Sequence, residues 1–437
     1  MAFYDNITKE DTDVAYKTIK KEYGFATVLC GTYAIFKPGI YTILSIIQIS
    51  IFFIVLILNT IALAITVYLS LNDQTVATQT VHFIFMNAIT FTILFSSNYT
   101  RPSLSRFHDD IGRDIQPYDH DTMKTVDNLK IYMKKLQKVI YITVPLLIGV
   151  FGMLIVSLGP ISDYFTGDFG KKIYNENGVS VNLALPCWTP FGSNSTISFL
   201  ISGTLQILDH YIIVTDIVTA NLIMTVMVRH VLIEIHLLIS ALNRLPERAA
   251  IMYQKIYGKK CNGKITEYHE NPSLQHCYNE CIKQNIKHHI RIIRLINDMN
   301  TFWNYTLMIF FFVSTISMAF SGILIMFGDG KITTLVNALV MGFTEIFDVF
   351  YICWCGKSIS DASELLYMAL YDTKWINANK ESAKFILIMM AMTKNPYEIY
   401  FNSINKLPAN FETFANLINT AYSYFNLLYA FREDKAN

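Results

Sequence analysis

The stretch Pro38–Asn72 reads PGIYTILSIIQISIFFIVLILNTIALAITVYLSLN and holds 35 consecutive residues without Asp, Glu, Lys or Arg. A helix that crosses the hydrocarbon core of a bilayer needs about 20 mostly apolar residues. The stretch is long enough for one complete span. It therefore predicts a transmembrane helix and sets the fold class.

The composition of the whole chain agrees with that reading. Of its 437 residues, 52% are hydrophobic and 16% are charged, against about 25% charged in a typical soluble domain. The mean hydropathy is +0.34. A formal net charge of +1 provides no basic field for a nucleic-acid partner. We predict an integral membrane protein that is surrounded by lipid.

Six further stretches have the length and low charge of a span. Phe385–Met392 is too short to cross a bilayer and is predicted to be a buried helix outside it. The chain is therefore predicted to be an all-α protein with seven transmembrane helices, the later six within Gln74–Thr100, Val139–Ser162, Ile197–Val228, Met299–Gly328, Ile332–Gly356 and Thr413–Phe431.

Lysine and arginine are distributed very unevenly among the connections between these spans. With seven spans, 30 of the 35 basic residues fall on the side that carries the N-terminus. Cytoplasmic loops carry the excess of positive charge. We predict a cytoplasmic N-terminus and an extracellular C-terminus, which argues against a G-protein-coupled receptor.

Helical patterns continue beyond several spans on the cytoplasmic side. His120–Tyr141 and Tyr278–Met299 place apolar residues three and four apart among lysines, which indicates that spans extend below the membrane. Apolar runs within 358–405 indicate a compact helical domain under the bilayer.

The C-terminal residues carry the most specific pattern. One block reads Ala-Tyr-Ser-Tyr-Phe-Asn-Leu-Leu over 421–428. It follows a set of residues formed by Ser363–Leu366, Ala369, Tyr371 and Trp375. Leu185–Phe191 forms a loop with the order Pro-Cys-Trp-Thr-Pro. Together these patterns resemble the insect odorant receptor family.

The resemblance implies a ligand-gated, non-selective cation channel without a cofactor. It implies a heterotetramer in the plasma membrane of an olfactory sensory neuron dendrite, in which odour-binding subunits assemble with a co-receptor. The odour pocket then belongs to 1–356, the cytoplasmic anchor to 357–412, and the pore-lining span to 413–437. Ser423 and Ala430 depart from the ending of the related gustatory receptors, which favours the odorant branch.

Span seven has one face with helical spacing, formed by Thr420, Tyr424, Leu427 and Phe431. Polar residues followed by large apolar ones suit a conduction path that a hydrophobic constriction closes. By resemblance, Leu427 occupies that constriction and Phe431 flanks it. Ordinary helix packing without a pore contact is the alternative.

A pocket for a small neutral volatile odorant requires apolar walls with one or two polar groups. We expect it in the outer half of spans two to six, where lipid contact or core packing is the alternative role for each residue. The candidates are Phe83, Met86, Phe151, Gly152, Phe199, Tyr211 and Met318.

Four acids interrupt the spans, namely Asp209, Asp216, Glu345 and Asp348. An acid in hydrocarbon costs roughly 2.5–3.5 kcal/mol even on the mildest scale. These side chains should therefore face the bundle interior or water. Pairing with a His, Arg or hydroxyl is favoured over a cation path, and Asp348 could lie at the cytoplasmic interface.

Other chemistry finds little support in the sequence. Cys277 and Cys281 lie one helical turn apart, but four zinc ligands at finger-like spacing are not evident. No nucleophile–base pair or phosphate loop predicts an enzyme. Of four glycosylation sequons, only Asn194 falls in an outer loop. A homotetrameric gustatory receptor, a transporter or a G-protein-coupled receptor stays as the alternative function.

Overall fold

The computed structural model describes residues 9–24, 40–113, 118–139, 165, 179, 183, 185–190, 196–259, 271–327, 332–373, 375, 379–401 and 406–436. Predicted span three, Val139–Ser162, lies outside the described residues apart from its first residue.

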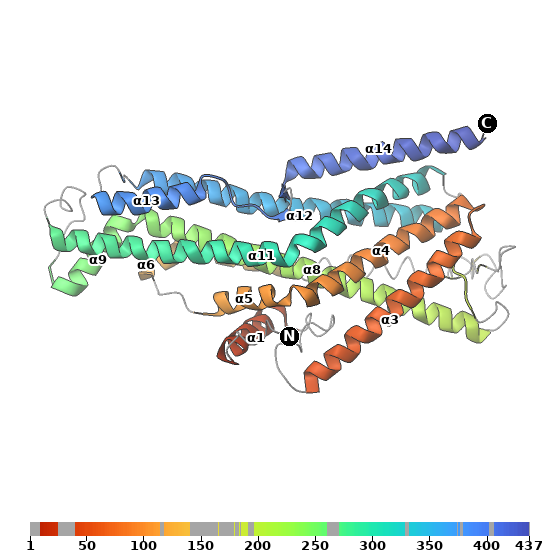
Figure 1. Ribbon diagram of the computed structural model, residues 1–437, viewed down its shortest axis with the longest axis horizontal. Coiled ribbons are helices and arrows are strands. Elements are labelled where there is room, and N and C mark those ends of the chain that lie inside the picture. The colour runs from red at the N-terminus through yellow and green to blue at the C-terminus, as the bar shows by residue number, and fades with distance from the viewer. Residues whose placement is uncertain are drawn as a thin grey trace.

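Long helices form an elongated bundle (Figure 1). They are α3 (Ile40–Leu69), α4 (Gln74–Tyr99), α8 (Thr196–Asn243), α11 (Pro272–Phe327), α12 (Ile332–Asp372) and α14 (Phe411–Ala436). Among the described residues, the first five of these contain stretches long and apolar enough to cross a membrane. The Asn, Thr and Ser residues of α14 make it less apolar than the others.

Shorter elements surround the long helices. They are α1 (Lys9–Tyr23), α5 (Arg101–Gly112), α6 (His120–Thr125), a helical stretch at 127–139, α9 (Leu245–Tyr257), α13 (Lys380–Thr393), β1 (Tyr400–Phe401) and β2 (Leu407–Pro408). The two strands pair antiparallel, with Tyr400 opposite Pro408 and Phe401 opposite Leu407.

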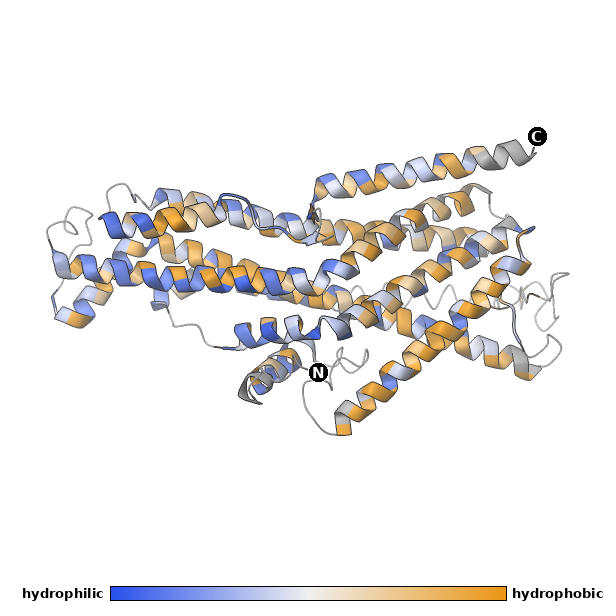
Figure 2. Ribbon diagram, viewed as in Figure 1, coloured by the Kyte–Doolittle hydropathy of each residue, from blue (hydrophilic) through white to orange (hydrophobic). Residues whose placement is uncertain are grey.

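The bundle divides along its length by hydropathy (Figure 2). Hydrophobic residues predominate around α3, α4 and the adjoining halves of α8, α11 and α12, whereas hydrophilic residues increase toward α9 and α13. One face of α3 exposes a continuous row of large apolar side chains, which is the expected surface of a helix in lipid. The row includes Ile43, Ile47, Ile51, Ile54, Leu58 and Ile61.

The structure extends one expected helix and interrupts another. The fourth predicted span ends at Val228, but α8 continues to Asn243 because Val231, Ile235 and Leu238 bury an apolar face below that point. The expected helix from His120 is interrupted at Val126. The Asp119 side chain caps the short α6, and Thr125 hydrogen-bonds Ser240 at 2.6 Å. For Tyr278–Met299, the expected extension is present as part of α11.

The segment between α13 and α14 is hydrogen-bonded to α11. The Asn300 amide on α11 donates to the Glu398 carbonyl at 2.9 Å, and its oxygen accepts from the Tyr400 backbone N–H at 3.3 Å. The predicted short helix is α13, whose Ile386 and Met389 are buried. Gly356 on α12 lies directly against the Ala409 carbonyl, where a Cβ would not fit.

Candidate functional site

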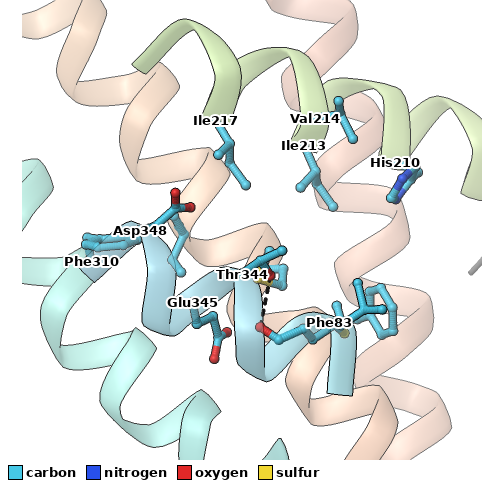
Figure 3. Close-up of a pocket in the computed structure, with 13 residues that line it drawn as sticks. Phe83, His210, Ile213, Val214, Ile217, Phe310, Thr344, Glu345 and Asp348 are labelled. Atoms are coloured by element: carbon cyan, nitrogen blue, oxygen red, sulfur yellow. Dashed lines mark hydrogen bonds between the residues drawn. The ribbon is translucent and has the colours of Figure 1, made fainter. Parts of the chain in front are cut away.

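A cavity of about 60 Å³ lies between α4, α8, α11 and α12 (Figure 3). In the close-up, Ile213 and Ile217 of α8 point toward α12, and the Asp348 carboxyl points back toward α8. The walls are mainly apolar, as a site for a small organic ligand requires. The lining residues are Phe83, Met86, Ile89, His210, Ile213, Val214, Ile217, Phe310, Val340, Met341, Thr344, Glu345 and Asp348.

Two of the sequence-predicted ligand residues, Phe83 and Met86, line this cavity. The predicted residues Phe151 and Gly152 lie outside the described residues, and so does the side chain of Phe199. Tyr211 neighbours the cavity residue His210, but its ring meets Phe52 edge-on at 6.4 Å and is 43% exposed. Tyr211 therefore faces away from the cavity.

Sequence reasoning did not select the cavity residues contributed by α8 and α12. The apolar ones, such as Ile213, Ile217 and Met341, lie in helices that are apolar around most of their circumference, so no periodic signal marks the facing side. The acidic residues within the spans were the signal that could have identified this face, because an acid in a span should face the bundle interior or water. Glu345 and Asp348 both border the cavity.

Asp348 lies buried between two cavities inside the helix bundle. A second cavity, of about 40 Å³, shares Ile89, Ile217, Phe310 and Asp348 with the first. The Asn221 amide donates to Asp348 Oδ1 at 3.2 Å, which links α8 to α12. Asp348 therefore places a carboxyl group at the junction of the two spaces.

Glu345 belongs to a polar cluster beside the cavity. Its carboxyl points away from α8 in Figure 3 and lies 3.5 Å from Nε2 of His82. The Ser317 hydroxyl lies 3.1 Å from His82 Nδ1. These side chains are almost completely buried, and neither carboxyl oxygen of Glu345 has a hydrogen-bond partner among the described residues, so the approach to His82 compensates the burial of this acid only in part.

The two remaining acids in the spans have different surroundings. Asp209 accepts a hydrogen bond from the Asn59 amide at 2.5 Å, which joins α8 to α3. Asp216 is buried, and its Oδ2 has no hydrogen-bond partner among the described residues. Amides are thus the hydrogen-bond partners of Asp209 and Asp348, whereas the sequence analysis anticipated His, Arg or hydroxyl groups.

Met318, also predicted in the ligand pocket, lines a separate groove between α14 and the bundle. This groove has a volume of about 320 Å³ and is lined mostly by apolar side chains. Gly322 of α11 and Phe425 of α14 both line it and pack against each other, since a Cβ on Gly322 would lie 2.9 Å from the Phe425 ring.

The face of α14 that carries the predicted pore residues is exposed. The predicted pore residues Thr420, Tyr424 and Leu427 are exposed, and the side chain of Phe431 lies outside the described residues, as does Asn194. Figure 1 shows α14 along one side of the bundle, where it packs against α11 and α12. A helix with polar and apolar residues exposed together is suited to line a shared aqueous path.

Known proteins resemble this chain in both sequence and fold. The family model described as 7tm Odorant receptor matches residues 148–422. Odorant receptor 85c of Drosophila melanogaster is 24% identical over 147 residues, or 34% of this chain and 37% of that protein. Odorant receptor 10 of Aedes albopictus is 25% identical over 146 residues, 33% of this chain and 37% of that protein. The matched region thus spans little more than a third of these relatives.

A solved structure extends the likeness to nearly the whole fold. The insect olfactory receptor OR5 from Machilis hrabei, in complex with eugenol, aligns with a TM-score of 0.70 at 11% identity and covers 95% of this chain and 99% of that one. At this identity the likeness concerns the fold. Because the family model covers more than half of the sequence, this multi-pass membrane protein belongs to the insect odorant receptor family.

Proposed function

We propose that the chain is the odour-binding subunit of a non-selective cation channel that an odorant opens. The observation that carries this proposal is the apolar cavity enclosed by α4, α8, α11 and α12. A buried apolar space with a few polar groups is the usual form of a small-molecule site. The family and the fold support the same role.

The ligand in this proposal is a small neutral volatile. None of the 13 residues that line the cavity is Lys or Arg, so no lining side chain offers a permanent positive charge to an acidic ligand. Apolar walls contribute affinity by removing the apolar body of the ligand from water. A receptor of similar fold solved in complex with eugenol supports a ligand of this size.

Binding opens the channel in this proposal because the ligand prefers a wider cavity. About 60 Å³ is small beside the roughly 300–1,000 Å³ of typical ligand pockets. A ligand that fits better when α8 and α12 separate shifts the population toward that arrangement. Both α11 and α12 pack against α14, so movement of these helices reaches the proposed pore helix.

The proposed pore is lined by α14 of several subunits around a central axis. The conduction face in this proposal consists of Thr420, Tyr424, Leu427 and Phe431. Leu427 forms the constriction that closes the pore. The exposure of the first three side chains in the single chain supports this role. The helical anchor at 357–412 joins the subunits below the membrane, and 1–356 holds the odorant.

We further propose a heterotetramer with co-receptor subunits in the plasma membrane, at the dendrite of an olfactory sensory neuron. The N-terminus is cytoplasmic and the C-terminus extracellular, as the lysine and arginine distribution supports. A homotetrameric gustatory-type channel is the alternative within the superfamily. A G-protein-coupled receptor or transporter is the alternative from another class.

Expression in cells with and without the co-receptor separates these functions. We expect an odorant panel to evoke cation current only when both chains are present, and the current to persist when G-protein signalling is blocked. Robust current from this chain alone would favour the homotetramer. Loss of the response under G-protein blockade would favour the receptor class.

A further inference from the structure

We propose that Asp348 selects odorants that carry a hydroxyl group. The inference rests on the proposed function and specifies the ligand class of the same cavity. Its basis is the position of one buried carboxyl group at the junction of two apolar cavities.

Asp348 is the acidic residue common to both spaces. It lines the main cavity and the second cavity, it is 8% exposed, and its carboxyl points toward the α8 side chains across the space (Figure 3). Within the described part of the chain, the Asn221 amide is its hydrogen-bond partner, through Oδ1. The second carboxyl oxygen is therefore available to a ligand.

The other polar groups on the wall are bonded or placed differently, although His210 Nε2 and both carboxyl oxygens of Glu345 have no hydrogen-bond partner among the described residues. The Thr344 hydroxyl already donates to the Met341 carbonyl at 2.9 Å. Glu345 directs its carboxyl away from α8 (Figure 3), toward His82. His210 lies at the opposite end of the cavity from Asp348 in the same view, with Ile213 and Ile217 between them.

The chemistry of a buried carboxyl favours a hydroxyl partner. A hydroxyl both donates and accepts, so it pairs with the group whether or not the carboxyl carries its proton. An ether of the same skeleton has no donor. A buried polar group that loses hydrogen-bonding capacity incurs a desolvation cost, so the alcohol should bind better than its ether.

Geometry places the rest of such a ligand against apolar residues. With its hydroxyl at Asp348, the body of the ligand would extend along Ile217 and Ile213 of α8 toward Phe83 of α4. The hydroxyl would also share the carboxyl with the Asn221 amide, which links α8 to α12. Recognition would thus occur at the contact between the two helices that must separate.

The test compares matched pairs of volatile alcohols or phenols with their methyl ethers. Currents are recorded from this chain co-expressed with the co-receptor. In the wild type we expect the half-maximal concentration to be about tenfold lower for the hydroxyl member of a pair. Asp348→Leu keeps a branched side chain of similar length and should bring the two members within about twofold.

Thr344→Val is the matched control. It removes a hydroxyl from the same wall, but that hydroxyl is already bonded to the Met341 carbonyl, so the preference for alcohols should persist. Surface labelling establishes that each variant reaches the membrane. The wild-type comparison needs no variant and tests the inference even where Asp348→Leu folds poorly.

Ethers that act as well as alcohols on the wild type would overturn the inference, and so would a preference that survives in Asp348→Leu. Amines as the best agonists would also overturn it. In all these cases odour-gated current is still observed. Failure of the proposed function looks different, because no odorant would then evoke a current that depends on the co-receptor.

Discussion

Gly322 is the residue that allows α14 to pack closely against α11. A Cβ at this position would lie 2.9 Å from Cδ2 of the Phe425 ring, which is closer than carbon atoms pack without strain. Phe425 also contacts Tyr422 and Tyr429 on its own helix, with ring centroids 6.3 and 6.2 Å away. The ring therefore has neighbours that restrict its movement.

We predict that Gly322→Ala destabilises the detergent-solubilised protein by about 1–3 kcal/mol, the usual cost of overpacking. Thermal unfolding monitored by size-exclusion chromatography measures the effect. Phe425→Leu in the same chain should restore part of the loss. Gly203→Ala on α8, where a Cβ meets nothing within 4 Å, is the control and should be neutral or mildly stabilising. Equal effects at the two glycines would contradict this account.

Glu22 connects α1 to α8 through charged contacts. Its Oε2 lies 2.6 Å from Arg229 Nη2, and its Oε1 lies 3.3 Å from His230 Nε2. Burial by itself raises the pKa of Glu22, but the hydrogen bond with His230 and the charge of Arg229 lower the pKa from 4.5 to about 2. The carboxylate is therefore more favourable in the folded chain than in the unfolded one.

The lowered pKa fixes the sign of a pH prediction. The carboxylate contributes its full stabilisation above pH 4.5 and loses it as the pH falls toward 2. Glu22→Gln should cost about 3 kcal/mol at neutral pH, and the difference in unfolding temperature from the wild type should shrink between these pH values. Glu280→Gln, which breaks an exposed pair with Lys283, should cost under about 1 kcal/mol. A pH-independent difference would exclude this mechanism.

At the scale of elements, α14 exposes polar and apolar side chains together. It packs against α11 and α12 on one face, where Ala421 is buried, and leaves Thr420, Tyr424 and Leu427 exposed on the other. An amphipathic helix that stays exposed in the monomer needs water or partner subunits on its open face. The proposed pore supplies both.

We predict that Leu427→Ser raises the current in the absence of odorant or alters ion selectivity, because a polar ring stays hydrated where an apolar one excludes ions. The preference order among odorants should stay unchanged. Single cysteines at 424, 427 and 431 should react with a water-soluble thiol reagent, and the reaction should reduce current. Cysteine at 421, on the buried face, is the control. If all three positions are inert in channels that open normally, this face does not line the pore.

At the scale of the whole molecule, the connections define an orientation that can be measured. Asn98 and Asn304 lie within α4 and α11. The Asn98 amide donates to the Leu94 carbonyl at 2.7 Å, and Asn304 is buried. Neither sequon is therefore presented in a form that a glycosyltransferase can reach, which leaves Asn6 and Asn194 to distinguish the two orientations.

We predict that an antibody on intact cells detects a tag at the C-terminus but not one at the N-terminus. Glycosidase treatment should shift the mobility of the protein only if Asn194 is present, so Asn194→Gln should abolish any shift and Asn6→Gln should not. Permeabilised cells provide the control for tag exposure. A glycan on Asn6 would reverse the proposed orientation.

The amino-acid sequence by itself determined the class of protein and the positions of most long helices. Whether a stretch is long and apolar enough to span a membrane depends only on its own residues. Charge-free stretches such as Pro38–Asn72 could therefore be identified as helices directly from the sequence. The terminal pattern at 421–428 was likewise local and pointed to the family. Short helices such as α5 and α9 carry mixed sequences and were not anticipated, because packing against neighbours stabilises them.

Only the tertiary structure decided which helix faces meet. α8 and α12 are apolar around most of their circumference, so lipid-facing and protein-facing sides look alike in the sequence. Phe83, His210 and Asp348 lie in three helices and come together only when those helices pack. The cavity and its buried carboxyl therefore depend on relative helix rotation, which contacts between distant segments determine and local sequence does not.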